Sequence, residues 1–261
     1  MHHTDSTHLI YFSPTNTSKS IGYSIAEELA GPAFHRHDLT FATAEEALPA
    51  TALAIIVVPV YAGRIAPLAR KRLEAIRGAG TPAVLVVVYG NRDFEDALLE
   101  LQDLAQSQGF VPLAAAAFIG EHSYSTSNTP IGAGRPDEAD LLAAKEFGRE
   151  VAERLAHSGD SALQVPGNAE YRQGVGPVDY TPQVDSTLCN FCETCTSVCP
   201  AGIISAVEGK ILFEAGDCIR CCACIKSCPT SAISFAVPAL AELALKLHNN
   251  CRTRKEPRLF F

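Results

Sequence analysis

The stretch DCIRCCACIKSCPTSAISF, residues 217–235, decides the fold of the C-terminal part of the chain, because it contains five of the ten cysteines. Four of them, Cys218, Cys221, Cys224 and Cys228, follow the spacing C-x2-C-x2-C-x3-C-P, whereas Cys222 lies off that spacing. Thiols this close together in a short loop can reach one metal centre. We therefore interpret the four as metal ligands and Cys222 as a small buried residue.

The same spacing occurs once more, 29 residues upstream (218 − 189). The members of this first run are Cys189, Cys192, Cys195 and Cys199. In bacterial ferredoxins with two such runs, three thiolates of one run and the last thiolate of the other bind one [4Fe–4S] cluster. Residues 187–236 closely resemble these two-cluster ferredoxins, and Ile204 and Ile233 also fall in register. The resemblance implies two [4Fe–4S] clusters with crossed ligands: Cys189, Cys192, Cys195 and Cys228 for one, and Cys218, Cys221, Cys224 and Cys199 for the other.

A pair of zinc sites is the alternative for so many cysteines. Zinc sites generally pair two Cys-x-x-Cys elements at a longer separation, whereas here three evenly spaced cysteines precede a Cys-Pro. Nine of the ten cysteines lie between 189 and 228, and the tenth, Cys251, has no assigned role. In a cytoplasmic chain such clustering indicates metal ligation before disulfides.

The charge balance and the apolar runs limit what the chain can bind. It has 21 basic and 29 acidic residues, and the net charge of −8 argues against nucleic acid as a partner, since phosphate binding depends on Lys and Arg. The opening MHHTDSTHLIYF lacks the cationic and long apolar regions of a signal peptide. The longest apolar runs are shorter than the ~20 residues that a membrane span needs. We therefore expect a soluble, cytoplasmic protein without a membrane span.

The first part of the chain alternates short apolar runs with helical patterns, which predicts an α/β fold. Two runs, LAIIVVPVY at 53–61 and AVLVVVYG at 83–90, are continuously apolar, as parallel strands covered on both faces are. Asp93 is the expected cap of a helix that ends before Gly109. The other expected elements are strands at 8–13, 34–39 and 111–120 and helices at 16–30, 67–80 and 137–156. Five strands separated by helices predict a doubly wound parallel sheet of order 2-1-3-4-5.

Three loops of this sheet are candidates for a ligand site. The segment Ser13-Pro14-Thr15-Asn16-Thr17-Ser18 offers hydroxyls and backbone N–H groups at a helix start, the arrangement that holds a phosphate. An ordinary polar loop with a helix cap would have the same composition. Its position favours a ligand, because doubly wound sheets bind ligands at the carboxyl ends of strands 1 and 3, where the winding reverses. The two loops that should meet it there offer Pro59, Tyr61, Ala62 and Gly63, and Tyr89, Gly90, Asn91, Arg92 and Phe94.

Residues 8–157 resemble a flavodoxin, whose phosphate loop reads Ser/Thr-x-Thr-Gly-x-Thr and whose next two loops hold the isoalloxazine ring of FMN. The resemblance implies that FMN binds at the three loops, with its phosphate at Ser13 to Ser18. The chain departs from the pattern at Asn16, where the family usually has glycine. Asparagine tolerates the left-handed backbone conformation better than most residues, so the loop can still form.

Taken together, the chain resembles the flavodoxin–ferredoxin fusion proteins of anaerobic bacteria and archaea. The stretches PVYAGRIAP, VYGNRDFEDAL and GEHSYS are similar to stretches of that group. The expected organisation is a flavodoxin-like domain at 1–157, a linker rich in Gly and Pro at 158–186, an α+β ferredoxin domain at 187–236, and a C-terminal helix with a basic tail at 237–261.

The resemblance implies electron transfer, in which one-electron clusters are coupled to FMN, which can hold one or two electrons. Three functions fit. We favour a flavin-dependent reductase of a small molecule, whose clusters feed electrons to FMN. The alternatives are a carrier that passes electrons between redox protein partners, and a regulatory protein that uses its clusters structurally.

A few other residues have two interpretations each. His122, after the fifth strand, could line the flavin ring or donate a proton to a substrate, and it could equally be a loop histidine packed on Tyr124. Arg64 and Arg92 could meet an anionic substrate or the flavin phosphate, or need no role. The charges of the basic tail could be solvated, dock on an acidic partner or fold back on the acidic body.

Overall fold

The computed structural model describes residues 4–42, 45–156, 162–174, 180–214 and 216–261. Its centre is a parallel sheet of β2 (His35–Asp38), β1 (Ser6–Tyr11), β4 (Ala52–Tyr61), β7 (Thr81–Tyr89) and β8 (Phe110–Ile119), in that order. This confirms the predicted doubly wound sheet of order 2-1-3-4-5. The tail adds β13 (Arg258–Phe260), which pairs antiparallel with β8 and was not predicted from the sequence.

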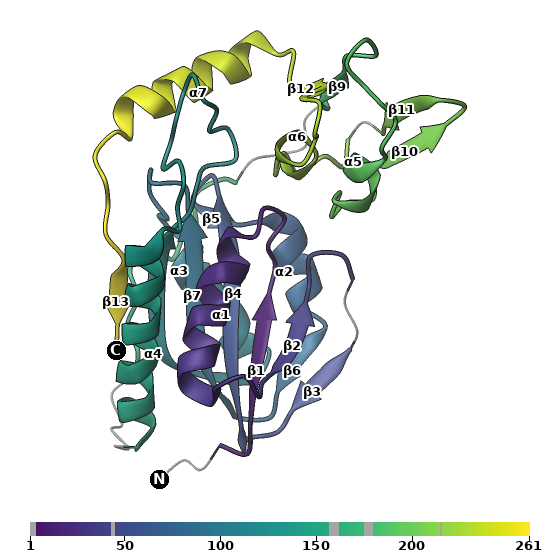
Figure 1. The fold of residues 1–261 in the computed structure, drawn as a ribbon. Helices are drawn as coiled ribbons and strands as arrows, with labels where there is room; N and C mark the ends of the chain where they lie inside the picture. The colour runs from purple at the N-terminus through teal and green to yellow at the C-terminus, as the bar shows by residue number, and fades with distance from the viewer. Residues whose placement is uncertain (1–3, 43–44, 157–161, 175–179, 215) are drawn as a thin grey trace.

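Helices cover both faces of the sheet (Figure 1). The helices α1 (Thr17–Ala30) and α4 (Glu138–Ala156) pack together on one face, and α2 (Pro67–Leu73) and α3 (Ala97–Ser107) cover the other. Because β4 and β7 are central, both of their faces are buried, which explains their continuously apolar sequences. The four alanines of β8 are fully buried as well, so packing overrides the poor strand propensity of alanine.

Two sequence predictions in this domain need correction. The helix expected at 67–80 ends at Leu73, and Ile76–Gly78 forms a short strand, β6, which pairs with β3 (Glu46–Leu48). Ile76 is almost fully buried, so strand pairing places it in the core. The next helix begins at Ala97, because the Asp93 carboxylate accepts hydrogen bonds from the N–H groups just after it and forms a turn before the helix.

The cysteine-rich segment forms a small domain above the carboxyl ends of the parallel strands (Figure 1). Each cysteine run contains a one-turn helix, α5 (Thr194–Ser197) or α6 (Ala223–Lys226), and is followed by a strand. These strands, β10 (Ile204–Val207) and β12 (Ile233–Ser234), begin at the two isoleucines predicted to be in register, and both isoleucines are buried in one small core. Their antiparallel partners are β11 (Lys210–Phe213) and β9 (Gln183–Val184).

Specific contacts hold this small domain against the sheet. Lys226 of α6 forms an ion pair of 2.7 Å with Glu121, which follows β8. On the other side, the Arg72 guanidinium of α2 donates a hydrogen bond of 2.7 Å to the Pro200 carbonyl, in the first cysteine run. Each of the two cysteine runs is therefore tied to the sheet domain by a charged side chain.

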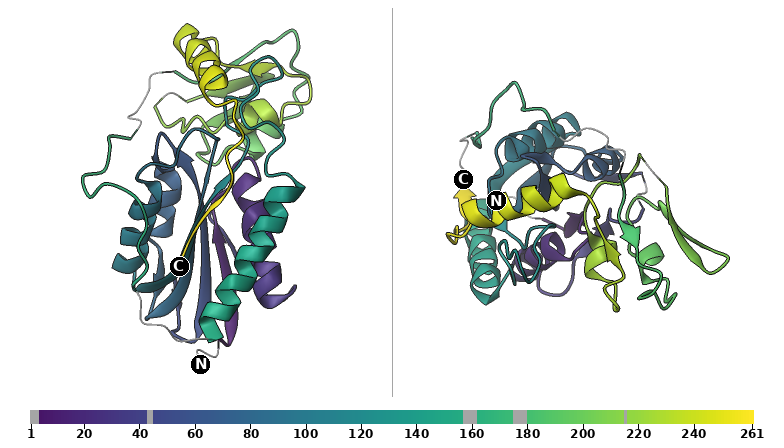
Figure 2. Two further views of the ribbon diagram at one scale, coloured as in Figure 1. Left: turned by 90° about the vertical axis from the view of Figure 1, so that its left-hand side faces the viewer. Right: turned by 90° about the horizontal axis from the view of Figure 1, so that it is seen from above.

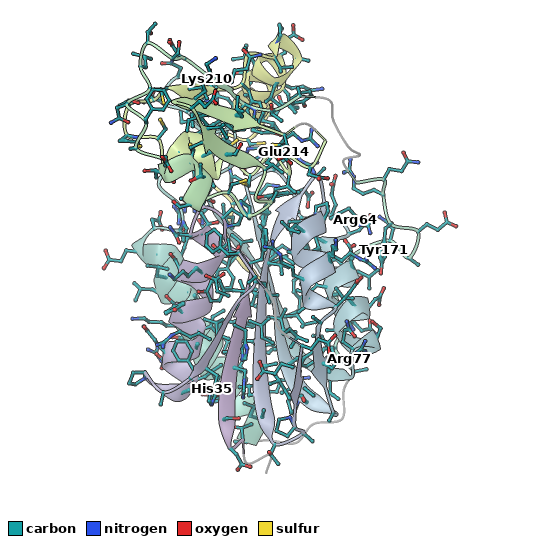
Figure 3. The ribbon with its side chains drawn as sticks, turned by 90° about the vertical axis from the view of Figure 1, so that its right-hand side faces the viewer. His35, Arg64, Arg77, Tyr171, Lys210 and Glu214 are labelled. Atoms are coloured by element: carbon teal, nitrogen blue, oxygen red, sulfur yellow. The ribbon has the colours of Figure 1, made fainter. Side chains whose placement is uncertain are left out.

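The predicted linker contains little regular structure, and its positions 158–161 and 175–179 lie outside the described residues. The part at 162–174 packs along α3. There the Asp96 carboxylate accepts hydrogen bonds from the backbone N–H groups of Asn168 and Arg172, and the Tyr171 ring stacks on the Arg64 guanidinium at 4.5 Å (Figure 3).

The C-terminal segment crosses the top of the molecule as α7 (Pro238–Asn250) and then runs down the edge of the sheet to β13 (Figure 2). The Asn91 side chain holds this tail by donating hydrogen bonds to the carbonyls of Cys251 and Thr253. Arg254 forms an ion pair of 2.6 Å with Asp137. The tail therefore folds back on the acidic body, which was one of its predicted alternatives.

Candidate functional site

A cavity of about 740 Å³ lies where the carboxyl ends of the strands meet the cysteine domain. Its floor is formed by the loops that follow β1, β4, β7 and β8, and its roof by the second cysteine run and α7. Cavities of this size hold cofactors or small ligands. The position is the switch point of the sheet, where the sequence predicted a ligand site.

The loop after β1 brings Thr15, Thr17 and Ser18 to the cavity. Asn16 has a φ of 64°, the left-handed conformation that the sequence analysis expected it to tolerate. The Ser18 hydroxyl oxygen is buried and has no hydrogen-bond partner among the residues that the structure describes. Ser13 shapes the loop from behind, since its hydroxyl accepts the Lys19 N–H at 3.0 Å. An orphan hydroxyl at a helix start is a group that a bound anion would satisfy.

The end of β4 contributes Pro59 and Tyr61 to the cavity wall, and the loop after it contributes Ala62. Burial raises the pKa of the Tyr61 phenol well above its ordinary value, with Cys221 and Cys222 as further causes. Gly63 has a φ of 80°, and a Cβ there would lie 1.8 Å from a carboxylate oxygen of Glu95. This turn therefore requires glycine.

The last residue of β7, Tyr89, and the loop residues Gly90 and Arg92 also line the wall. A Cβ on Gly90 would lie 2.4 Å from the His122 ring, so the glycine lets His122 pack directly on the loop backbone. The structure does not bring the other two predicted residues of this loop, Asn91 and Phe94, to the cavity. Asn91 is buried against the C-terminal tail, and Phe94 is buried in the core beside Tyr89.

His122 lines the cavity, and its ring also packs on that of Tyr124 at 5.2 Å between centroids, so the structure contains features of both interpretations. Burial lowers the pKa of its imidazole to about 4, with the cations Lys226 and Arg92 as smaller causes. Its Nδ1 accepts the Tyr124 N–H at 3.0 Å, so the neutral ring carries its proton on Nε2. At neutral pH His122 is therefore a neutral hydrogen-bond donor at the cavity wall.

The two arginines considered for anion binding are engaged with carboxylates. The Arg64 guanidinium donates two hydrogen bonds of 2.7 Å to Glu100, whose side chain is almost fully buried. Arg92 makes the same kind of paired contact with Glu95. Both arginines line the cavity, but each already has a partner for its charge.

The roof of the cavity was not predicted from the sequence. Cys218, Ile219 and Arg220 of the second cysteine run line it, together with four residues of α7. These four are Leu243, Lys246, Leu247 and Asn250. The spacing of Leu243 and Leu247 is that of one helix face, which was the available signal that α7 covers something apolar.

The cysteines gather in two groups. The outer group, which surrounds a small hollow, consists of Cys189, Cys192, Cys195 and Cys228. The inner group surrounds another hollow next to the large cavity and consists of Cys199, Cys218, Cys221, Cys222 and Cys224. In each group the fourth member of one run joins three members of the other.

The thiols of the inner group lie in apolar surroundings. Burial raises the pKa of Cys221 to about 12, so this thiol stays protonated at neutral pH unless a metal replaces the proton. Cys222 is buried, as predicted, and has a φ of 61° at the start of α6. Cys251 packs against Leu247 and Ile131 in the core below α7.

Comparisons with known proteins identify the cysteine-rich part of the chain. Residues 181–239 match the family model described as a 4Fe-4S dicluster domain. An uncharacterized ferredoxin of Methanocaldococcus jannaschii is 33% identical over 69 residues, which are 25% of this chain and 47% of that protein. The chain thus spans about half the length of this relative.

Among solved structures, the chain is similar to a flavodoxin from the domain Archaea, with a TM-score of 0.38 and 12% identity over 58% of this chain and 99% of that one. It is also similar to a Fusobacterium nucleatum flavodoxin bound to flavin mononucleotide, with a TM-score of 0.34 and 17% identity over 58% of this chain and 95% of that one. The strand order independently gives the first part a flavodoxin-like fold. Among the described residues, no helix is both long and apolar enough to span a membrane.

Proposed function

We propose that this protein is an FMN- and iron–sulfur-dependent reductase of a small molecule. The chain joins a flavodoxin-like sheet to a 4Fe-4S dicluster domain and is therefore an electron-transfer protein. The reductase activity is the more specific function proposed here. The observation that carries the proposal is the shared wall of the large cavity. Thr15 and Ser18 line it from below, and Cys218 of the inner cysteine group lines it from above. A flavin and a cluster bound at these residues would be neighbours.

The outer and inner cysteine groups are the proposed cluster ligands. Each group contains three cysteines of one run and the last cysteine of the other, which supports the crossed assignment. Cys222 belongs spatially to the inner group but lies off the ligand spacing, and we assign it no iron. The proposed division of the chain follows this arrangement, with domains at 1–157 and 187–236, a linker at 158–186 and the helix and tail at 237–261.

The floor of the cavity is the proposed FMN site. The unpartnered Ser18 hydroxyl, with Thr15 and Thr17 beside it at the start of α1, suits the phosphate group. Tyr61 and Tyr89 supply aromatic surfaces for a ring between the next two loops. When bound, FMN exchanges one or two electrons, whereas each cluster exchanges one, so the pair links one-electron donors to a two-electron reduction.

The depth of the cavity favours a reductase over a carrier. A carrier needs its flavin edge at an open surface, but here α7 and the second cysteine run form a roof over the floor loops. The roof leaves a partly covered cavity with polar groups such as His122 and Lys246 along its wall. Electrons would be supplied by a redox protein partner at the outer cysteine group, where Cys192 is exposed.

Cofactor analysis tests the proposal first. Protein purified without oxygen should contain about eight iron atoms, about eight sulfides and one FMN per chain. Zinc in place of iron and sulfide would reject the clusters. Protein that contains both clusters, but does not take up added FMN, would reject the flavin site.

A second experiment separates a reductase from a carrier. The substitution Leu247→Trp fills the α7 side of the cavity, where Leu247 is only 9% exposed. A reductase should keep its FMN and clusters and lose turnover with small electron acceptors. The matched control is Leu245→Trp on the solvent side of the same helix, where Leu245 is 51% exposed. Equal turnover in both variants would favour the carrier.

A further inference from the structure

A group of histidines lies at the opposite end of β1 from the phosphate loop. His8 on β1 is buried, and His37 on the edge strand β2 and Glu46 on β3 lie beside it. His35, also on β2, stacks on the His8 ring at 4.5 Å and is labelled in Figure 3. None of these side chains lines the large cavity, so the proposed flavin chemistry does not use them.

Strand pairing explains how these residues come together. His8 is the partner of His35 in the parallel ladder, and Ile10 is the partner of His37. Side chains two residues apart on a strand point to the same face of the sheet, so His35 and His37 flank His8 on one face. On β1 the same face continues with Ile10, which is buried in the core. A strand position in such a row normally carries an apolar residue, so an imidazole there needs a polar partner.

The three side chains form a chain of direct contacts. His8 Nδ1 lies 3.0 Å from His37 Nε2, and His37 Nδ1 lies 2.8 Å from a carboxylate oxygen of Glu46. One ligand atom from each of the three residues can be chosen so that all lie within 4.8 Å of one another. Two ligand atoms bound to one tetrahedral ion at about 2.0–2.2 Å lie about 3.3–3.6 Å apart, so a bound ion would replace these direct contacts. The Ser6 hydroxyl lies 3.0 Å from His8 Nε2 and so fixes the ring from behind.

We propose that His8, His37 and Glu46 bind one divalent zinc ion, with water as the fourth ligand. Two imidazoles and one carboxylate are a common zinc ligand set, and the hydroxyl of Ser6 acts as the outer partner that orients a histidine ligand. The side chains of His37 and Glu46 are 15% and 38% exposed, which gives the ion a path from solvent. The bound ion would join β1, β2 and β3 at the edge of the sheet.

This site is independent of the proposed electron transfer, and its test must exclude zinc bound by empty cysteine sites. The protein is therefore used anaerobically with its full iron content. It is incubated with zinc, passed through a desalting column and analysed for metals. We expect about one zinc per chain. The zinc X-ray absorption spectrum should show nitrogen and oxygen neighbours at about 2.0–2.1 Å and no sulfur at about 2.3 Å.

The substitution His37→Gln should weaken zinc binding by more than about 100-fold. Loss of a residue that only hydrogen-bonds to a metal ligand usually weakens binding by about 10- to 100-fold, so a larger loss indicates that His37 is itself a ligand. The matched control is His35→Gln, which removes the exposed neighbouring imidazole and should leave zinc binding unchanged. Zinc should also raise the unfolding temperature of the wild-type and His35→Gln proteins but not that of His37→Gln. Equal zinc content in all three proteins, or sulfur in the zinc spectrum, would overturn the proposal.

Discussion

The two cysteine groups have the same spacing in sequence and very different surroundings. In the outer group Cys192 is exposed, and the neighbouring Leu188 and Phe191 are 50% and 43% exposed. In the inner group Cys221 and Cys224 are buried, and Cys218 forms part of the cavity roof. Spacing therefore determines which thiols meet, whereas packing determines what each group faces.

This difference gives the proposed electron path a direction in space. An exposed group with apolar neighbours is the accessible side for a redox partner, and a buried group at the cavity is the side for the flavin. The pKa values reflect the same contrast. Hydrogen bonds from Thr194 lower the pKa of the Cys192 thiol, and burial raises that of Cys221.

The largest expected effect comes from replacing the fourth cysteine of each run by serine, which should remove one cluster and leave the other. Cys228→Ser should lose the cluster of the outer group, and Cys199→Ser that of the inner group. In each variant about four of eight iron atoms should disappear, because three thiolates hold a cubane poorly. Iron and sulfide analysis gives the total, and electron paramagnetic resonance of the reduced proteins shows which signal is lost.

The control for this experiment is Cys222→Ser, which changes a buried thiol of the inner group that lies off the ligand spacing. It should retain about eight iron atoms. If Cys228→Ser and Cys199→Ser lost the same signal, the two groups would not be separate sites and the crossed assignment would be wrong.

The second effect concerns the cavity, which only the inner group borders. Ser18→Ala removes the buried hydroxyl that has no hydrogen-bond partner in the described part of the chain. FMN affinity should fall roughly tenfold to a hundredfold, because a hydrogen bond to a charged group contributes about 1.5–3 kcal/mol. Stability without FMN should not decrease, since no bond within the protein is lost. Flavin fluorescence titration and thermal unfolding measure the two quantities.

The iron content of Ser18→Ala should equal that of the wild type, because the substitution touches the floor of the cavity and not its roof. Thr40 offers a contrast in the same region: its hydroxyl already accepts the Ser13 N–H at 2.9 Å. Thr40→Val should therefore destabilise the protein even without FMN. Unchanged FMN affinity in Ser18→Ala would mean that the FMN phosphate does not bind at this loop.

The features that the sequence predicted correctly depend on local chemistry. The central strands followed from apolar runs such as 53–61, and the left-handed Asn16 followed from its place in the loop. The grouping of Cys228 with the first run is a long-range contact, which was expected only from the resemblance to two-cluster ferredoxins.

The features that the sequence did not predict depend on contacts between distant segments. Asn91 was expected at the flavin because it lies in the right loop, but its amide holds the tail, 160 residues further along the chain. Arg64 donates hydrogen bonds to Glu100, and Ile76 lies in a strand that pairs with β3 instead of in the expected helix. No local pattern encodes these partners.

The smallest effect is expected from pH, and it tests the wall of the cavity beside the loop that follows β8. His122 lies near Lys226 of the second cysteine run, and its pKa of about 4 keeps the imidazole neutral above pH 6. An imidazole with an ordinary pKa near 6.5 would gain charge as the pH falls, and would then bind an anionic flavin more tightly. FMN affinity should instead vary less than about twofold between pH 6 and pH 8.

His122→Asn should give the same flat profile. A rise in affinity below about pH 6.5 that disappears in His122→Asn would mean that the ring is charged in the complex. The neutral cavity wall inferred here would then be wrong.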